Sequence, residues 1–209
     1  MSDANRRAHW DNVYTTKGEK DVSWFQENPA PSLDLIALTG LSEGAAMIDI
    51  GGGASRLVDD LLARKFRRLT ILDLSGAALA AASERLGDRG ADVQWVTADI
   101  TTWEPAQAYD LWHDRAVFHF LTDQADQFAY VDRLKRAVSP EGHVIIGTFA
   151  PDGPERCSGL PVVRYDAASL ARVFGSDFAL IDARRHQHTT PWGAIQQFQF
   201  STFRRARSV

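Results

Sequence analysis

The chain has 209 residues, of which 44% are hydrophobic and 24% are charged, and its formal net charge is −4. These values are typical of a globular protein and exclude collagen, disulfide scaffolds and disordered tails. The acidic balance makes nucleic acid an unexpected partner, and no apolar run approaches the roughly 20 residues of a membrane helix. A single cysteine, Cys157, and a polar N-terminus predict a cytoplasmic protein.

The first 30 residues are polar with scattered aromatic side chains, and they end in two prolines, Pro29 and Pro31, which predict a turn. A helix is expected over residues 32–39, with Ser32 as a candidate N-cap and Gly40 as the stop. We expect a single domain over residues 1–209. In it, residues 1–30 form a covering segment and residues 31–209 form the core.

From residue 46 onward, short apolar runs alternate with segments of helical periodicity. The expected strands are residues 46–50, 69–74, 93–97, 109–113, 143–149, 178–184 and 195–203. The expected helices are residues 55–65, 75–86, 123–138 and 167–174. This alternation predicts an α/β fold, a Rossmann-like three-layer sandwich around a seven-stranded, mostly parallel sheet. Residues 185–194 lack a helical pattern, so the last two strands should pair as a C-terminal antiparallel hairpin.

The sharpest motif is a run of three glycines, Gly51 to Gly53, between the first strand and the following helix. Glycines at this place allow a tight turn and let a ligand approach the backbone without Cβ clashes. Asp49 precedes the run and Ser55 follows it. The spacing does not match the G-x-G-x-x-G pattern that holds a pyrophosphate.

Two carboxylates strengthen the motif. Asp73 ends the second expected strand, where an acidic residue can accept hydrogen bonds from ribose hydroxyls. Asp99 ends the third, where it could accept a hydrogen bond from an adenine amino group. Open α/β sheets bind ligands at the carboxyl ends of adjacent strands, so the three features together predict a site for a nucleoside-type cofactor. The alternative for each aspartate is a helix cap, although Ser75 already supplies a cap after Asp73.

The loop resembles that of class I S-adenosylmethionine-dependent methyltransferases, which reads D/E-x-G-x-G-x-G. Asp49, Gly51 and Gly53 match this pattern, and Ser55 replaces the third glycine. The resemblance covers about residues 45–205. It implies S-adenosylmethionine as cofactor and S-adenosylhomocysteine as product. The cofactor-binding residues that it implies are Tyr14, Trp24, Asp49, Gly51, Gly52, Gly53, Ser55, Asp73, Leu74, Asp99, Ile100 and His113.

The opening segment is similar to the YWDxxY…W start of several methyltransferase subfamilies, through residues 9–14 and 23–25. The similarity implies that the segment folds over the cofactor. Tyr14 would then contact the methionine carboxylate, and Trp24 and Phe25 would line the acceptor pocket. The alternative is that these aromatic residues only dock an N-terminal helix on the core.

The end of the fourth strand, around Asp114 and Arg115, resembles the DRxxL region of thiopurine and thiol methyltransferases. It also resembles the DKGTFD region of lysine methyltransferases that act on elongation factors. Both resemblances imply Asp114 as a catalytic residue that orients the acceptor or takes its proton. The alternative is a cap or an ion pair with Arg115. His119 is a second candidate base, or a histidine at the edge of the core.

No metal site is expected, because the His-x-His spacing of His186 and His188 is weak and nothing shows that Cys157 converges on it. The leading interpretation is an S-adenosylmethionine-dependent methyltransferase that acts on a small molecule. A protein lysine methyltransferase and a non-catalytic cofactor-binding regulatory domain remain as alternatives. Neither a nucleic acid nor a membrane is an expected partner.

Overall fold

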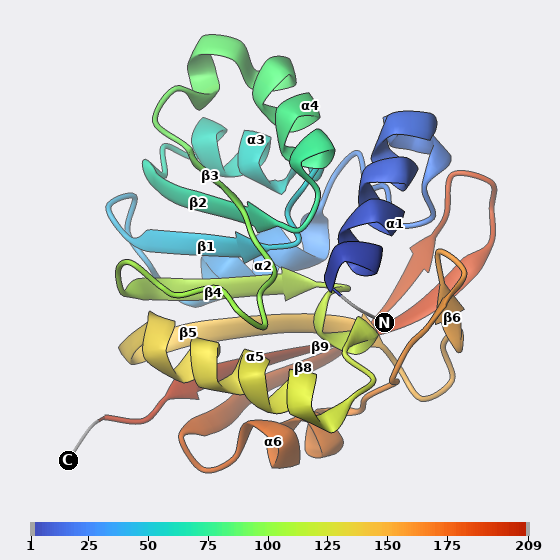
Figure 1. Cartoon of the computed structure of the whole chain (residues 1–209). Coiled ribbons are helices and arrows are strands. Elements are labelled where there is room, and N and C mark those ends of the chain that lie inside the picture. Colours follow the sequence, from blue (N-terminus) through green and yellow to red (C-terminus); the bar gives the residue numbers. More distant parts are fainter. Residues whose placement is uncertain (1–2, 208–209) are drawn as a thin grey trace.

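The computed structural model describes residues 3–207, and at its centre lies a twisted seven-stranded sheet (Figure 1). The strand order is β3-β2-β1-β4-β5-β9-β8. The strands are β1 (Ala46–Ile50), β2 (Arg68–Asp73), β3 (Gln94–Thr97), β4 (Tyr109–Arg115), β5 (Val138–Phe149), β8 (Phe178–Thr189) and β9 (Ile195–Arg205). Strands β3, β2, β1, β4 and β5 run parallel, whereas β9 pairs antiparallel with both β5 and β8. The mostly parallel sheet with its C-terminal antiparallel hairpin is therefore confirmed.

Helices cover both faces of the sheet and complete the three predicted layers. The α-helices are α1 (Asp3–Thr16), α2 (Ala30–Leu38), α3 (Leu57–Ala63), α4 (Gly76–Leu86), α5 (Gln124–Ala137) and α6 (Ala167–Phe174). One core unites apolar side chains of α2, α3 and α4 with one face of the sheet. A second core unites α5 and α6 with the other face, so α5 lies in front of the sheet in Figure 1 and α2 behind it. No helix in residues 3–207 is long and apolar enough to cross a membrane.

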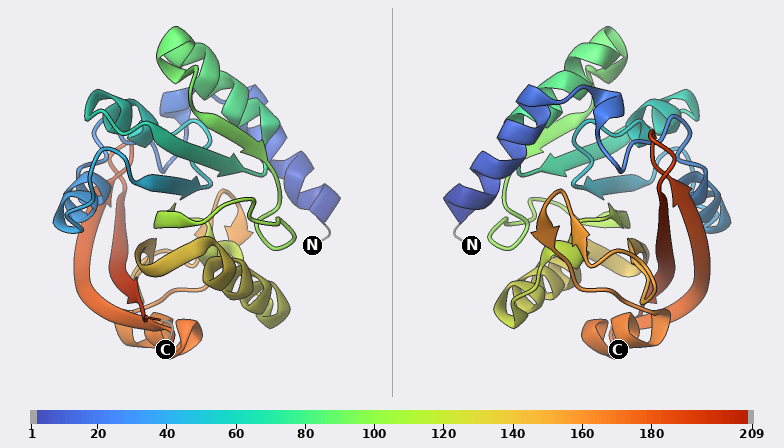
Figure 2. Two further views of the ribbon diagram at one scale, coloured as in Figure 1. Left: turned by 90° about the vertical axis from the view of Figure 1, so that its left-hand side faces the viewer. Right: turned by 90° about the vertical axis from the view of Figure 1, so that its right-hand side faces the viewer.

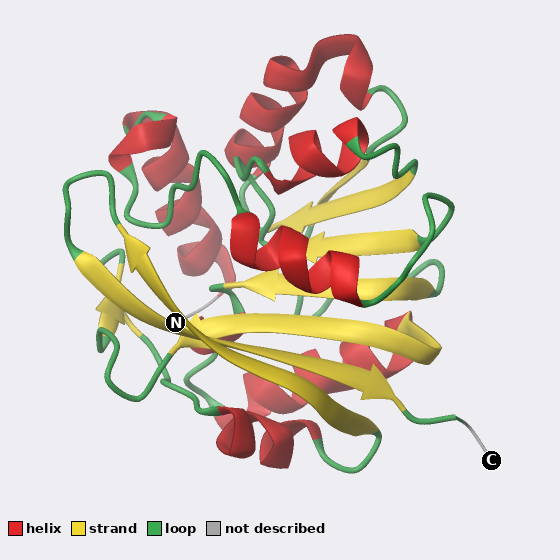
Figure 3. Cartoon of the chain, turned by 180° about the vertical axis from the view of Figure 1, so that it is seen from behind, coloured by secondary structure: helices red, strands yellow, loops and turns green. Residues whose placement is uncertain are grey.

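Several boundaries differ from those expected. Strand β5 begins at Val138 instead of residue 143, because Val138 pairs with Tyr109 across an irregularity in the register with β4. Strands β8 and β9 are longer than expected, because their pairing continues to Thr189 and Ile195, and Figure 3 shows them as long, curved strands at one side of the sheet. A small antiparallel hairpin lies in the loop after β5. Its two strands, β6 (Arg156–Cys157) and β7 (Leu160–Pro161), have two residues each.

The helix ends are partly as predicted. Ser75 caps α4 by accepting a hydrogen bond from the Ala78 amide, and Gly87 ends the same helix. The expectation for Ser32 is wrong, since α2 already begins at Ala30 and Ser32 is buried inside its first turn. Its hydroxyl is therefore available for a contact with another element.

Helix α1 packs against α4 and lies across the end of the sheet toward which the parallel strands point (Figure 2). In both views of Figure 2 the arrowheads of the teal and green strands are directed at this helix. Helix α1 thus covers the edge of the sheet where α/β proteins bind their ligands.

Candidate active site

Three carboxylates mark the covered edge of the sheet. Asp49 lies in β1, Asp73 ends β2, and Asp99 follows β3. Each of these residues is at most 9% exposed, so the carboxylates lie largely out of bulk water. Their grouping follows from the parallel order β3-β2-β1, because neighbouring parallel strands end at one edge.

The glycine loop after β1 passes very close to its neighbours. Gly51 adopts φ +67°, and its amide donates a hydrogen bond to the Leu72 carbonyl oxygen at 2.7 Å. A Cβ atom on Gly51 would lie 2.1 Å from Cγ2 of Val117, and one on Gly53 would lie 2.6 Å from Oδ2 of Asp73. Glycine is therefore required twice here, once for the left-handed backbone and once for the approach to a carboxylate.

Burial raises the pKa of Asp73 to about 7, and the nearby Asp49 and Asp11 carboxylates add to the increase. The Ser75 amide opposes this shift, donating to Oδ1 of Asp73 at 2.8 Å. A buried carboxylate whose partners are backbone amides is suited to bind ligand hydroxyl groups, which would stabilise its charged form.

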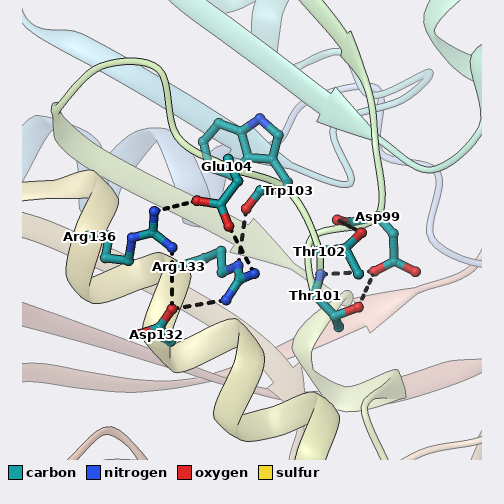
Figure 4. Close-up of polar contacts among 8 residues, drawn as sticks. All are labelled: Asp99, Thr101, Thr102, Trp103, Glu104, Asp132, Arg133 and Arg136. Atoms are coloured by element: carbon teal, nitrogen blue, oxygen red, sulfur yellow. Dashed lines mark hydrogen bonds and ion pairs between the residues drawn. The ribbon is translucent and has the colours of Figure 1, made fainter.

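Thr101 orients the Asp99 carboxylate. Its Oδ1 accepts hydrogen bonds from the amide and the hydroxyl of Thr101, at 2.8 and 2.7 Å. Figure 4 shows how the following segment is fastened to α5: the Trp103 carbonyl accepts from Arg133, and Glu104 pairs with Arg133 and Arg136. This anchoring fixes the loop that carries Asp99.

Helix α1 contacts Asp99 and Ser75 at this edge of the sheet. Nη2 of Arg6 lies 3.0 Å from Oδ2 of Asp99, and Nη1 lies 2.6 Å from Oδ2 of Asp126. The Asp11 carboxylate accepts a hydrogen bond from the Ser75 hydroxyl at 2.6 Å. Sequence reasoning missed Arg6 and Asp11, because their partners lie 93 and 64 residues away. No local pattern connects residues at that separation.

Two cavities open at this edge, with volumes of about 320 Å³ and about 110 Å³. Four residues line both of them: Tyr14, Trp24, Gly51 and Arg115. Of the predicted cofactor residues, the larger cavity also contains Asp49, Gly52, Ser55 and His113. The smaller one also contains Asp73, Leu74, Asp99 and Ile100. Gly53 borders neither cavity within the described chain, and instead makes room for Asp73.

Aromatic side chains from the N-terminal segment form one wall of the smaller cavity, and two of them also line the larger one. The ring of Trp10 contacts Trp24 edge-on at 5.7 Å and Phe120 at 5.1 Å, and Tyr14 contacts Trp24 at 6.2 Å. Burial raises the pKa of Tyr14 well above its usual value, so its phenol remains a hydrogen-bond donor. These residues therefore both dock α1 on the core and line the cavities.

His113 links β4 to β1 and α2. Its Nδ1 lies 2.6 Å from Oδ1 of Asp49, and its Nε2 lies 2.8 Å from the Ser32 hydroxyl. Asp49, predicted as a direct cofactor ligand, therefore has a buried partner at one of its oxygens. The Ser32 hydroxyl, predicted as a helix cap, orients His113 instead.

Asp114 and His119 do not reach the cavities, which departs from their expected catalytic roles. Both are 0% exposed, and neither borders either cavity within residues 3–207. Oδ1 of Asp114 accepts from the Val117 amide at 2.9 Å, and Oδ2 accepts from the Tyr130 hydroxyl at 2.7 Å. His119 accepts the Phe149 amide on Nδ1 at 3.3 Å, and burial lowers its pKa to about 3. Both side chains point into the core behind the β4 end.

Replacing Tyr130 with phenylalanine should destabilise the fold. The Tyr130 hydroxyl accepts from Nε1 of Trp112 at 2.8 Å while donating to Asp114, so the change leaves two buried polar groups without this partner. At about 1–3 kcal/mol for each group, the free energy of unfolding should fall by about 2–6 kcal/mol. Urea unfolding measures this loss. Tyr165→Phe is the matched control, because it removes one weaker contact at 3.2 Å, and equal losses would contradict the network.

Arg115 lines both cavities, which the sequence does not predict. The expected alternative was an ion pair with Asp114, but Nη1 of Arg115 donates to the Trp24 carbonyl oxygen at 2.8 Å. Cys157 lines the smaller cavity, whereas Nε2 of His188 lies 2.7 Å from the Ser23 carbonyl oxygen. The described residues contain no cluster of ligands that could hold a metal ion.

The strand order, the glycine loop and the carboxylates at the strand ends together define a Rossmann-like α/β protein with a ligand site at this edge of its sheet. Residues 48–144 match the family described as "Methyltransferase domain". This match covers just under half of the chain and shows that its central part resembles methyltransferase domains.

Two curated relatives show how far the sequence likeness extends. Trans-aconitate 2-methyltransferase of Variovorax paradoxus is 32% identical over 132 residues, which are 62% of this chain and 47% of the relative. Nodulation protein S of Rhizobium tropici is 27% identical over 115 residues, 54% of this chain and 48% of the relative. The chain thus spans about half the length of these relatives.

Solved structures show the same fold over most of the chain. The N-methyltransferase NodS from Bradyrhizobium japonicum superposes with a TM-score of 0.69 at 21% identity, covering 87% of this chain and 99% of its own. The 1,6-didemethyltoxoflavin-N1-methyltransferase of Burkholderia thailandensis gives 0.71 at 21% identity, covering 97% of this chain and 88% of its own.

Proposed function

We propose that the chain is an enzyme that binds S-adenosylmethionine and transfers its methyl group to a small molecule. The observation that carries the proposal is the row of three buried carboxylates beside the glycine loop, bordering two neighbouring cavities that share lining residues. The residues present fit the cofactor. Asp73 is a buried acceptor suited to ribose hydroxyls, and Asp49 supplies negative charge for a cationic ligand.

The chain contributes binding and orientation to the reaction. Asp73 and Asp99 would hold the nucleoside half, although an adenine amino group must share Asp99 with Arg6 or displace it. Tyr14 and Trp24 would place the amino-acid half between the two cavities. S-adenosylmethionine supplies an electrophilic methyl group that an acceptor atom attacks in line, so alignment is the main task of the protein. Asp114 and His119 act as positioning residues that hold the segment after β4.

A small acceptor is favoured by the aromatic enclosure. Trp10, Trp24 and Phe120 line the smaller cavity, and their rings contact one another. The names of the relatives point the same way, since trans-aconitate and 1,6-didemethyltoxoflavin are small molecules. A single domain over residues 1–209 and a cytoplasmic location belong to the same proposal.

Two measurements test this function. Isothermal titration should show S-adenosylhomocysteine binding to the folded wild-type protein, and no binding would end the proposal. Incubation of a cell extract with methyl-labelled S-adenosylmethionine should place label in the small-molecule fraction. A labelled protein band would favour protein methylation instead. Binding without any labelled product would favour a regulatory domain.

A further inference from the structure

Arg115 lines both cavities, and part of its guanidinium group lacks a partner. Nη1 donates to the Trp24 carbonyl oxygen, and the group lies 5.0 Å from the centre of the Phe198 ring. Nε and Nη2 are buried without a hydrogen-bond partner. Two donors on one side of a planar cation therefore remain unused.

Burying the Arg115 guanidinium group with two unpaired donors costs free energy unless a ligand binds to it. None of the ion pairs within residues 3–207 involves Arg115. Burial lowers the pKa of Arg115 to about 10, so the side chain is still charged at neutral pH. A buried cation is stabilised best by a carboxylate, whose two oxygens match the parallel donors of a guanidinium group.

The backbone holds Arg115 firmly in this place. It is the last residue of β4, and it pairs with Gly147 of β5. Ala116 follows with φ +70°, and its amide donates to the Gly147 carbonyl oxygen at 2.8 Å. A left-handed alanine is strained, so the contacts around it define the strand end. The two unused donors, Nε and Nη2, are called the Arg115 fork. The fold holds this fork in place, and it does not belong to a mobile surface side chain.

The surroundings indicate which ligand the fork serves. The larger cavity also contains Lys17 and two arginines, Arg56 and Arg85, that are paired with Glu19 and Asp59. Arg115 also borders the smaller cavity, together with Trp10, Phe120 and Cys157. The other cation of this cavity, Arg6, is paired with Asp99 and Asp126. An aromatic wall beside a cation that has no carboxylate partner suits a small organic acid, which places an apolar body on the rings and its charge on Arg115.

We propose that Arg115 binds a carboxylate group of the methyl acceptor, so that the enzyme selects acidic small molecules. This inference rests on the proposed function, because it assigns the substrate class of the same site. The carboxylate of the cofactor's methionine half has the same chemistry and is the competing source.

Acetate is the smallest probe of such a site, and acetamide is its neutral counterpart. Both are titrated at constant ionic strength into protein saturated with S-adenosylhomocysteine, while tryptophan fluorescence is recorded. Trp24 is the expected reporter, because it lines both cavities and its backbone carbonyl accepts a hydrogen bond from Arg115. Acetate should give a saturable change that acetamide does not give. Equal responses to the two probes would overturn the proposal.

Saturation with 5′-methylthioadenosine, which lacks the amino-acid half, separates the two carboxylate sources. If Arg115 serves the acceptor, acetate binds in the presence of either nucleoside. If acetate binds with methylthioadenosine but not with S-adenosylhomocysteine, Arg115 holds the cofactor carboxylate and the acceptor assignment is wrong. Failure of S-adenosylhomocysteine to bind at all is a separate result, which ends the proposed function and this assignment with it.

The variants complete the test. Arg115→Met should weaken acetate binding by about 10- to 100-fold, the loss expected for charged hydrogen bonds. S-adenosylhomocysteine affinity should change little. Arg115→Lys keeps the charge without the fork and should give an intermediate loss, which still decides the matter if the methionine variant does not fold. Arg184→Met is the control, since Arg184 pairs with Asp182 on exposed β8. Unchanged acetate binding in both Arg115 variants would refute the inference.

Discussion

Replacing Asp73 with asparagine is expected to make the protein more stable at pH 8 while removing most of its cofactor affinity. The carboxylate has a pKa near 7 in the folded protein, because burial disfavours its charged form, against 3.8 for an unperturbed aspartate. Above pH 7 the folded state therefore holds an ionised group that would be better solvated in the unfolded chain. Asparagine removes this charge and keeps an oxygen for the Ser75 amide.

The pH dependence follows from the direction of the shift. Between about pH 4 and pH 7 the folded state retains a proton that the unfolded state has lost, so the free energy of unfolding falls as the pH rises through this window. Above pH 7 it levels off. The variant lacks this slope and should exceed the wild type at pH 8 by roughly 2–4 kcal/mol, as judged from urea unfolding at several pH values. A variant less stable than wild type at pH 8 would contradict the buried-charge interpretation.

Cofactor binding should show the opposite preference. Ribose hydroxyls donate to the ionised form, so S-adenosylhomocysteine affinity of the wild type should fall as the pH drops below 7. Asp73→Asn should lose about 100-fold in affinity at pH 8, the value of two charged hydrogen bonds. Titration calorimetry measures both effects. Asp110→Asn is the control, because Asp110 sits at the start of β4 and binds the Ala46 amide at the opposite edge of the sheet. It should leave the affinity unchanged.

The second large effect is expected from Gly51→Ala. Its φ of +67° disfavours any side chain, and the added Cβ would lie 2.1 Å from Cγ2 of Val117. Relief of that contact must move the loop or the segment after β4, both of which line the smaller cavity. S-adenosylhomocysteine affinity should fall by about 100-fold or more, and the free energy of unfolding by about 1–3 kcal/mol.

Two further variants separate the causes of this loss. Gly40→Ala shares the left-handed backbone, with φ +69°, but a Cβ there meets nothing within 4 Å. It should cost about 1 kcal/mol of stability without changing affinity. The double variant Gly51→Ala with Val117→Ala removes the clash and keeps the strain, so it should regain part of the affinity. Equal affinity losses for Gly40→Ala and Gly51→Ala would show that the close approach to Val117 has no role.

The sequence predicted the parts of the site that depend on local order. A glycine loop after β1 and aspartates at the ends of β2 and β3 come together in any parallel sheet of this connectivity, whatever the packing details. It also predicted the antiparallel hairpin, because the chain between the last two strands has no helical pattern. The start of β5 could not be predicted from the sequence, because pairing with β4 extends the strand through the turn signals at residues 139–142.

The direction of side chains at the end of β4 was decided only by the tertiary structure. Alternation along a strand places Asp114 and Arg115 on opposite faces, but not which face meets a ligand. Packing of α5 puts Tyr130 beside Asp114 and leaves Arg115 facing the cavities. Likewise, Arg6 reaches Asp99 only because α1 folds back over the sheet. The sequence by itself determined the fold and the row of carboxylates through short-range periodicity and strand order. Contacts between distant segments decided which side chains cover, support and complete the site.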